Sequence, residues 1–217
     1  MLHARITKTK RNSPMWLRLR KILKRIVISN RSILKLFFSA FFDRRFLSGR
    51  YFDEQLIGYF WAANAVWTRN ILRLAAPLPF PTGFRTHVSN PRNIHFHPDD
   101  LNNLQSPGTY FQNFAGQIYL GKGCFIGPNV GIITANHDPS SLDEHLCAKD
   151  VRIGADSWIG MNAIILPGVT LGPRTIVAAG AIVTKAVPEG NCVLAGNPAK
   201  KIRNLGSEMT NLQRQAD

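Results

Sequence analysis

Histidine side chains are the groups in this sequence best suited to move a proton near neutral pH, because an unperturbed imidazole titrates at about pH 6.5. There are six, at His3, His87, His95, His97, His137 and His145. Only His137 lies where a regular pattern of apolar residues breaks off, directly before the 15-residue insertion 138–152. Insertions longer than about 12 residues are commonly lids or binding loops. We therefore predict a proton-transfer role for His137; the alternative is that it only ends the pattern.

The other candidate ligands and nucleophiles give weaker signals. His95 and His97 alternate as on a strand and resemble half of a zinc site, but no third ligand is suitably spaced, so we expect no metal. His145 lies within the insertion and either contacts a substrate or is an ordinary polar loop residue. The three cysteines are widely spaced and no GxSxG motif is present, so a covalent acyl-enzyme is the weaker hypothesis.

An apolar residue recurs every six positions from Phe114 onward, and this period predicts the fold. A unit of six residues is one short strand plus a turn, and three units make a triangular coil of about 18 residues. Stacked coils form a parallel β-helix, with the recurring side chain pointing inward. The ten predicted inward residues are Phe114, Leu120, Ile126, Ile132, Ile153, Ile159, Ile165, Leu171, Val177 and Val183.

The N-terminal segment differs sharply from this repeat in charge. Residues 1–50 hold 14 of the 27 Lys and Arg and one acidic residue, so they carry +13 of the net charge of +14. Residues 16–28 have apolar side chains at helical spacing with basic residues between them. Such a helix either lies on an anionic membrane surface or packs on its own protein. Because the rest of the chain is nearly neutral, we expect no nucleic-acid binding.

Composition also predicts the domain organisation. We expect a basic, largely helical segment and Pro-rich linker at 1–81, a β-helix at 82–205, and a tail at 206–217. Within the first part, residues 51–75 are predicted to be a further helix. No apolar run is as long as the roughly 20 residues that a membrane span needs, and no signal peptide is evident. We therefore expect a cytoplasmic protein, peripheral on the membrane if the N-terminal segment binds lipid.

Two stretches, PGVTLGPRTIVAAGAIVTK (167–185) and AGNPAKKIR (195–203), together with the period and the insertion, carry a family resemblance. The chain resembles the hexapeptide-repeat acyltransferases over about residues 85–205. The branch concerned contains galactoside, maltose and nodulation O-acetyltransferases and many capsule or exopolysaccharide O-acetyltransferases. This resemblance implies a mainly β protein with a left-handed parallel β-helix. It also implies a homotrimer with acetyl-CoA in the groove between neighbouring prisms.

The resemblance also implies roles for individual residues. His137 would be the general base of a direct transfer without an acyl-enzyme. Asn113 would contact the acceptor. It belongs to an Asn-Phe pair, and relatives that acetylate soluble sugars have this pair one repeat unit further upstream. The residues implied in CoA binding are Met161, Ala179, Thr184, Lys185, Lys200 and Arg203.

These expectations combine into one functional hypothesis with two alternatives. The hypothesis is an acetyl-CoA-dependent O-acetyltransferase for a sugar hydroxyl of a cell-surface glycan or its lipid-linked precursor. It would work at an anionic membrane surface reached through residues 1–50. The alternatives are another acceptor, serine or an amino sugar, and a non-catalytic trimeric β-helix scaffold.

Overall fold

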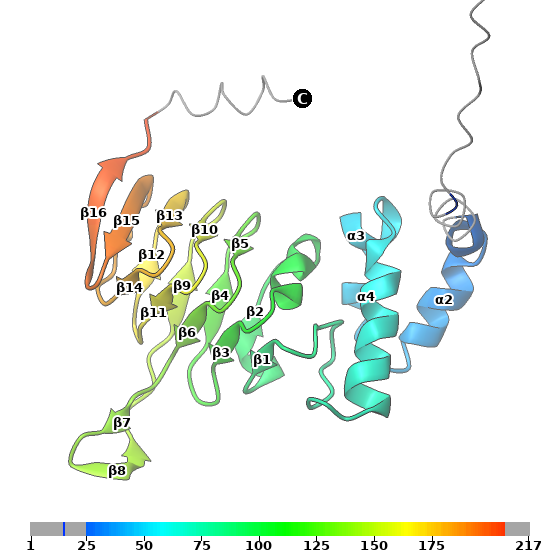
Figure 1. The fold of residues 1–217 in the computed structure, drawn as a ribbon, viewed down its shortest axis with the longest axis horizontal. Coiled ribbons are helices and arrows are strands. Elements are labelled where there is room, and N and C mark those ends of the chain that lie inside the picture. The colour runs from blue at the N-terminus through cyan, green and yellow to red at the C-terminus, as the bar shows by residue number, and fades with distance from the viewer. Residues whose placement is uncertain (1–14, 16–24, 207–217) are drawn as a thin grey trace, which may run out of the picture.

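The computed structural model describes Met15 and residues 25–206, which form a helical part followed by a β prism (Figure 1). Most of the predicted amphipathic helix 16–28 lies outside these residues, although residues 25–29 are helical. The helical part contains α2 (Arg31–Phe38), η1 (Arg44–Leu47), α3 (Arg50–Asp53), α4 (Ile57–Ala65) and the π-helical turn η2 (Val66–Ile71). No helix in the described residues is long and apolar enough to cross a membrane.

The predicted single helix over 51–75 is wrong, because the chain is broken between α3 and α4. Leu56 adopts a left-handed backbone conformation with φ 63°. The break folds α4 back onto α3, and a Cβ at Gly58 would lie 2.6 Å from the ring of Phe52. Glycine at this position lets the two helices pack closely.

The prism consists of three sheets whose strands come from successive coils. The sheet orders are β1-β3-β6-β11-β14, β16-β15-β13-β10-β5 and β12-β9-β4-β2, all parallel except the pair β15 and β16. The strands are β1 (His87–Val88), β2 (Ile94–His95), β3 (Tyr110–Gln112), β4 (Ile118–Leu120), β5 (Phe125–Ile126), β6 (Gly131–Ile133), β9 (Val151–Ile153), β10 (Trp158–Ile159), β11 (Ile164–Ile165), β12 (Thr170–Leu171), β13 (Thr175–Val177), β14 (Ile182–Val183), β15 (Cys192–Gly196) and β16 (Ala199–Asn204).

Strand register confirms both the coil length and the insertion. Ile164 pairs with Ile182, which stands three repeat units further along the chain, as a coil of three units requires. Gly131 pairs with Ile164 and not with position 149, so this coil is longer than a regular one by the length of the insertion 138–152. The parallel β-helix expected from the period is therefore the observed fold. In the first coil the 3-10 helix η4 (Pro98–Gln105) takes the place of a strand beside β5.

Nine of the ten predicted inward residues are buried, and Phe114 is the exception. Its side chain is 41% exposed, whereas Phe111 is fully buried and pairs with Ile132. A regular coil would pair Phe111 with position 129, so this coil is longer by three positions. The longer coil shifts the inward position from Phe114 to Phe111.

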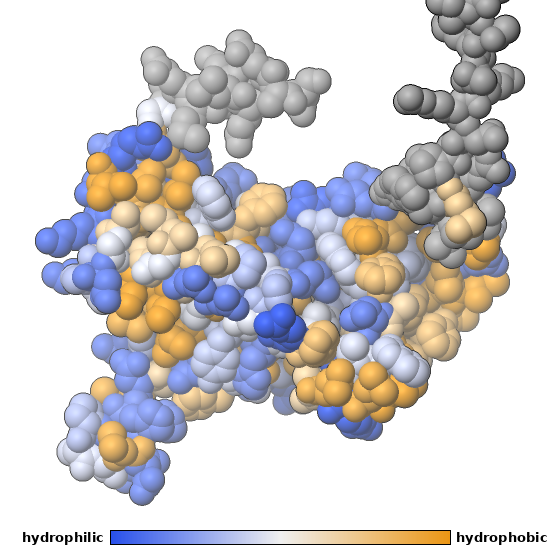
Figure 2. Space-filling view, in the orientation of Figure 1, coloured by the Kyte–Doolittle hydropathy of each residue, from blue (hydrophilic) through white to orange (hydrophobic). Residues whose placement is uncertain are grey.

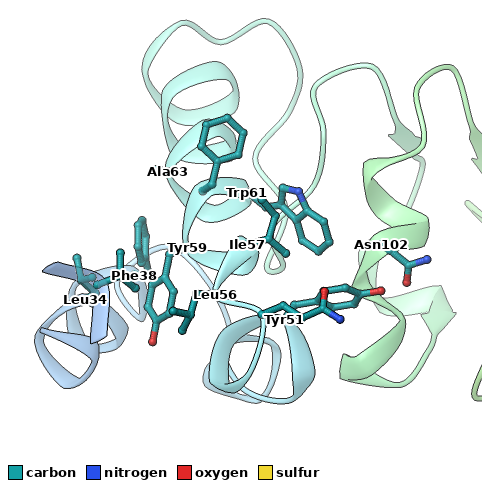
Figure 3. Close-up of a pocket in the computed structure, with 12 residues that line it drawn as sticks. Leu34, Phe38, Tyr51, Leu56, Ile57, Tyr59, Trp61, Ala63 and Asn102 are labelled. Atoms are coloured by element: carbon teal, nitrogen blue, oxygen red, sulfur yellow. The ribbon is translucent and has the colours of Figure 1, made fainter. Parts of the chain in front are cut away.

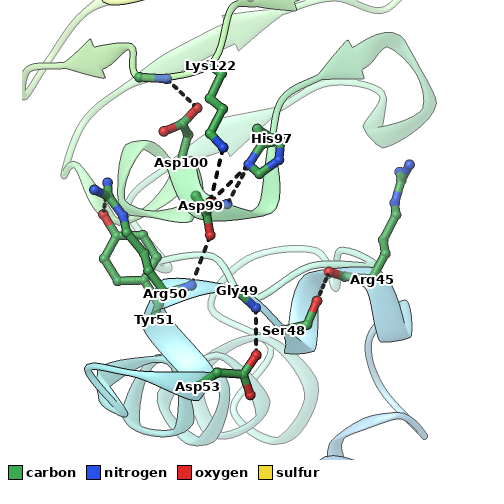
Figure 4. A network of polar contacts seen from close by, with 11 residues as sticks. Arg45, Ser48, Gly49, Arg50, Tyr51, Asp53, His97, Asp99, Asp100 and Lys122 are labelled. Carbon is green, nitrogen blue, oxygen red and sulfur yellow. Dashed lines mark hydrogen bonds and ion pairs between the residues drawn. The ribbon is translucent and has the colours of Figure 1, made fainter.

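A polar junction joins the helical part to the prism (Figure 4). Asp99 in η4 accepts the backbone N–H of Arg50 at 2.9 Å, and Lys122 Nζ lies 3.5 Å from the same carboxylate. The adjacent Asp100 is buried and accepts the N–H of Gly123 at 2.9 Å. One short element therefore fixes both parts of the molecule to each other.

Candidate functional site

The 15-residue insertion folds into a two-stranded antiparallel hairpin that projects from the prism (Figure 1). Its strands are β7 (His137–Asp138) and β8 (Ser141–His145). Asp138 caps the turn, because its Oδ1 accepts both the N–H and the hydroxyl of Ser140, at 2.8 and 2.6 Å. The return strand is tied to the prism by the N–H of Lys149, which donates to the Thr134 carbonyl at 2.8 Å. His137 thus begins an ordered arm rather than standing at a corner of the prism.

His137 has the proton arrangement that a general base needs. Its Nδ1 lies 2.7 Å from the backbone carbonyl oxygen of Leu142, across the hairpin. Because a carbonyl oxygen can only accept, Nδ1 of the neutral imidazole carries the proton and Nε2 presents its lone pair. The side chain is exposed, so a hydroxyl can reach it. The same carbonyl would stabilise the imidazolium once Nε2 has taken a proton.

His145 and Phe114 complete an aromatic cluster around His137. The rings of His137 and His145, which face each other in the hairpin register, have centroids 4.2 Å apart. The exposed ring of Phe114 meets His145 edge-on at 4.9 Å. The sequence shows only that His145 lies within the insertion. Its pairing with His137 could not be predicted, because that pairing depends on where the hairpin turns.

Asn113 is occupied within the protein, so its predicted contact with an acceptor is wrong. Its side chain is fully buried. Its Oδ1 accepts the N–H of Asn90 at 3.0 Å, and its Nδ2 donates to the Asn90 carbonyl at 2.7 Å. The shift by three positions in this coil explains the outcome, since it turns Asn113 inward and leaves its neighbour Phe114 outside.

The residues implied in CoA binding are exposed, on two edges of the prism and on β16. Met161 and Ala179 occupy equivalent positions on successive coils, where the N–H of Gly180 donates to the Met161 carbonyl at 2.9 Å. Thr184 and Lys185 directly follow β14, whose sheet also contains β6, the strand from which the hairpin emerges. One edge therefore carries both the hairpin and two of the residues implied in CoA binding.

The C-terminal basic cluster lies on the antiparallel strand β16. Lys200 pairs with Ala195 and Arg203 with Val193 in the register of β15. Lys201 lies 3.7 Å from Glu189, whereas within residues 25–206 no carboxylate comes within ion-pair distance of Lys200 or Arg203. These two exposed cations are thus available to an anionic ligand.

Two of the three cysteines, Cys124 and Cys192, are buried, and Cys147 is exposed. Burial raises the pKa of the Cys124 thiol to about 11 and also raises that of Cys192, so neither is a ready nucleophile. His95 stacks on Tyr119 at 4.6 Å. No group of three metal-ligating side chains is found in the described part of the chain.

Trp158 belongs to an exposed apolar row on the face of one sheet. It stands in register between Phe125 and Ile176 on neighbouring strands, and both aromatic side chains are more than half exposed.

Comparisons with known proteins agree with the repeat. Residues 150–185 match the family described as "Bacterial transferase hexapeptide (six repeats)". The protein named "Putative acetyltransferase YJL218W" from Saccharomyces cerevisiae is 43% identical over 93 residues, which cover 41% of this chain and 46% of that protein. "Putative acetyltransferase SAV2555" from Staphylococcus aureus is 31% identical over 135 residues, or 61% of this chain and 62% of that one. The chain therefore spans less than two thirds of either relative.

Solved structures with similar coils include two acetyltransferases. A maltose O-acetyltransferase from Clostridium difficile is 34% identical with a TM-score of 0.42, covering 46% of this chain and 54% of that one. A galactoside acetyltransferase in complex with coenzyme A is 25% identical with a TM-score of 0.42, covering 58% of this chain and 65% of that one.

Proposed function

We propose that this chain, whose residues 150–185 match the hexapeptide-repeat transferase family, belongs to that family and transfers an acetyl group from acetyl-CoA to a sugar hydroxyl. The acceptor is a cell-surface glycan or its lipid-linked precursor, and the working unit is a homotrimer. The observation that carries the proposal is the hydrogen bond from His137 Nδ1 to the Leu142 carbonyl at 2.7 Å, which leaves Nε2 as an exposed base. The relatives named as acetyltransferases support the reaction class.

In the proposed reaction, His137 Nε2 removes the proton from the acceptor hydroxyl as its oxygen attacks the thioester carbonyl. The new C–O bond forms and the C–S bond breaks. The imidazolium then gives its proton to the departing CoA thiolate, so no proton is left over. A positioned base of this kind contributes about 10²- to 10⁴-fold to the rate.

The donor would be held by the exposed residues on the prism edges and on β16. Lys200 and Arg203 provide positive charge for CoA phosphates without competing carboxylates among the described residues. Met161 and Ala179 offer an apolar edge and backbone groups to the pantetheine arm. Lys185 lies on the edge from which the hairpin projects, so it would bind the donor close to His137.

The helical part supports membrane attachment. Its exposed apolar side chains include Ile33, Leu36 and Phe37 on α2 and Phe60 on α4. Figure 2 shows hydrophobic surface gathered over this part of the molecule, at the right of the view. Together with the +13 charge of residues 1–50, this surface suits an anionic membrane. We expect co-sedimentation with vesicles that contain anionic lipid and release from them when residues 1–50 are removed.

The transfer reaction is tested by replacing the base. His137→Ala should lower acetyl transfer by about 10²-fold or more, measured as CoA release with a panel of glycoside, amino-sugar and serine acceptors. His87→Ala removes an exposed histidine outside the hairpin and should leave the rate unchanged. Full activity of His137→Ala would refute the role of His137 as the base, and no transfer by the wild type to any acceptor would support the scaffold alternative. A preference for serine or an amino sugar would redirect the acceptor class.

A further inference from the structure

The helical part contains a cavity of about 960 Å³ that is separate from the hairpin (Figure 3). It lies between α2, α3 and α4 and reaches Asn102 in η4. Its walls are mainly apolar, and include Leu34 and Phe38 from α2 and Ile57 and Trp61 from α4. An apolar cavity of this size is typical of sites that enclose much of a small ligand.

Two polar atoms of residues in the cavity wall have no partner among the described residues. They are the hydroxyl of Tyr59, a residue that is only 4% exposed, and Oδ1 of Asn102. Buried polar atoms are nearly always hydrogen-bonded in native proteins. Burial raises the pKa of Tyr59, so its hydroxyl keeps its proton at neutral pH and can donate it to a ligand oxygen. The wall of the cavity therefore combines apolar side chains with a buried hydroxyl that has no acceptor among the described residues.

Two cations lie on α2, beside the residues of that helix that line the cavity. They are Arg31 and Lys35, and the charges of both Asp53 and Arg31 act on the Tyr59 hydroxyl, that of Asp53 more strongly. Lys35 bonds Asp53 at 2.6 Å and also lines a second cavity of about 290 Å³ together with Arg44. An apolar chamber beside cations complements an amphiphile that has an anionic head and a hydrocarbon tail.

We propose that this cavity binds the hydrocarbon chain of a phosphate-bearing lipid, with the phosphate on the α2 side, where Arg31 lies. Two protein segments could also cover the cavity, residues 1–24 of the same chain or a second copy of the chain, and charge argues against both. Residues 1–24 contain eight Lys and Arg and no acidic residue, and a second copy would bring the same +13 segment. Both would place like charge against α2. The site goes beyond the proposed acetyl transfer, because lipid binding here does not require the base in the hairpin.

The test is calorimetric titration of the full chain with alkyl monophosphates of increasing length, kept below their micelle concentration. Affinity should rise about fourfold for each added methylene while the chain is still entering the cavity. It should then reach a plateau when the cavity is full, which neither a flat surface nor a micelle would produce. The matching alcohols, which lack phosphate, should bind at least about tenfold more weakly.

Matched variants locate the site. Ala63→Trp adds a bulky side chain to the cavity from an exposed position on α4 and should weaken dodecyl phosphate binding at least about tenfold. Ala63→Leu should have a smaller effect, which keeps the test informative if the first variant folds poorly. Ile33→Trp places the same new side chain on exposed α2 outside the cavity and should bind as the wild type does.

Three results would overturn the proposal. They are equal binding of inorganic phosphate, no dependence on chain length, and unchanged binding by Ala63→Trp. If no alkyl phosphate binds and Ala63→Trp instead changes the oligomeric state in sedimentation, a second copy covers the cavity. His137→Ala should keep lipid binding while losing transfer, so the failure of one proposal is distinguishable from the failure of the other.

Discussion

Arg69 gives the structure its most demanding stability prediction, because one buried guanidinium holds the linker between the helices and the prism. The side chain is 3% exposed. It donates to the carbonyls of Ala76, Thr82 and Gly83 at 2.6, 3.1 and 2.8 Å, and also to that of Thr86. Burial lowers the pKa of Arg69 to about 10, which leaves it charged at neutral pH.

The loss of unfolding free energy that we expect for Arg69→Met follows from the burial of these hydrogen bonds. Two of them, to Thr82 and Thr86, are buried, and the other two are partly buried, so water can replace the lost donor there. A buried acceptor without a partner costs about 1–3 kcal/mol, so two of them predict a loss of about 4 kcal/mol. That is a large fraction of the roughly 5–15 kcal/mol that stabilises a typical domain.

The assay is urea unfolding at pH 7, followed by tryptophan fluorescence and circular dichroism. Trp61 and Trp67 lie in the helical part and Trp158 in the prism. The control is Arg73→Met, since Arg73 is exposed and bonds only Asn70 within the described residues, at 3.0 Å. Arg73→Met should lower the unfolding free energy by less than about 0.5 kcal/mol. A loss below about 1 kcal/mol for Arg69→Met, or an equal loss for the control, would refute the reasoning.

Two further predictions concern the prism. Gly154→Ala should destabilise it by about 3 kcal/mol in urea unfolding, because the new Cβ would lie 2.4 Å from the backbone of Gly172 and Pro173. The control is Gly131→Ala, whose new Cβ would have its nearest atom at 3.7 Å, so the unfolding free energy should change little. Burial raises the pKa of Asp100 above 3.8, so the native state loses stability as this carboxyl ionises. Asp100→Asn keeps an acceptor for Gly123 and should raise the unfolding free energy at pH 7, with the gain shrinking as the pH falls toward 3.8. A destabilised Asp100→Asn at pH 7 would show that the charge of Arg50 matters more than burial.

Periodicity made most of the prism predictable. A six-residue unit is a local property of the backbone, so it identified nine buried positions and the 15-residue insertion, and the register of Gly131 with Ile164 agrees with both. It failed at Phe114, because three additional positions in one coil change the phase without changing the residue types. The prediction for Asn113 failed for the same reason.

The candidate base is a prediction from the sequence, whereas its surroundings could not be predicted. His137 could be selected because it directly precedes the insertion. Its hydrogen bond to Leu142, its ring contact with His145 and the approach of Phe114 all depend on how the hairpin turns and where it leaves the prism. No spacing rule in a single sequence encodes these distances.

The sequence by itself therefore determined the class of fold and nine of the ten inward side chains, because a repeat of six residues fixes the local backbone geometry. Only the tertiary structure decided the proton position on His137, the burial of Asn113, the clamp at Arg69 and the cavity among the helices. The hydrogen bond of His137 spans only five residues but depends on where the hairpin turns, and the other three features arise where different elements meet. Such meetings depend on the packing of whole elements, which local patterns do not specify.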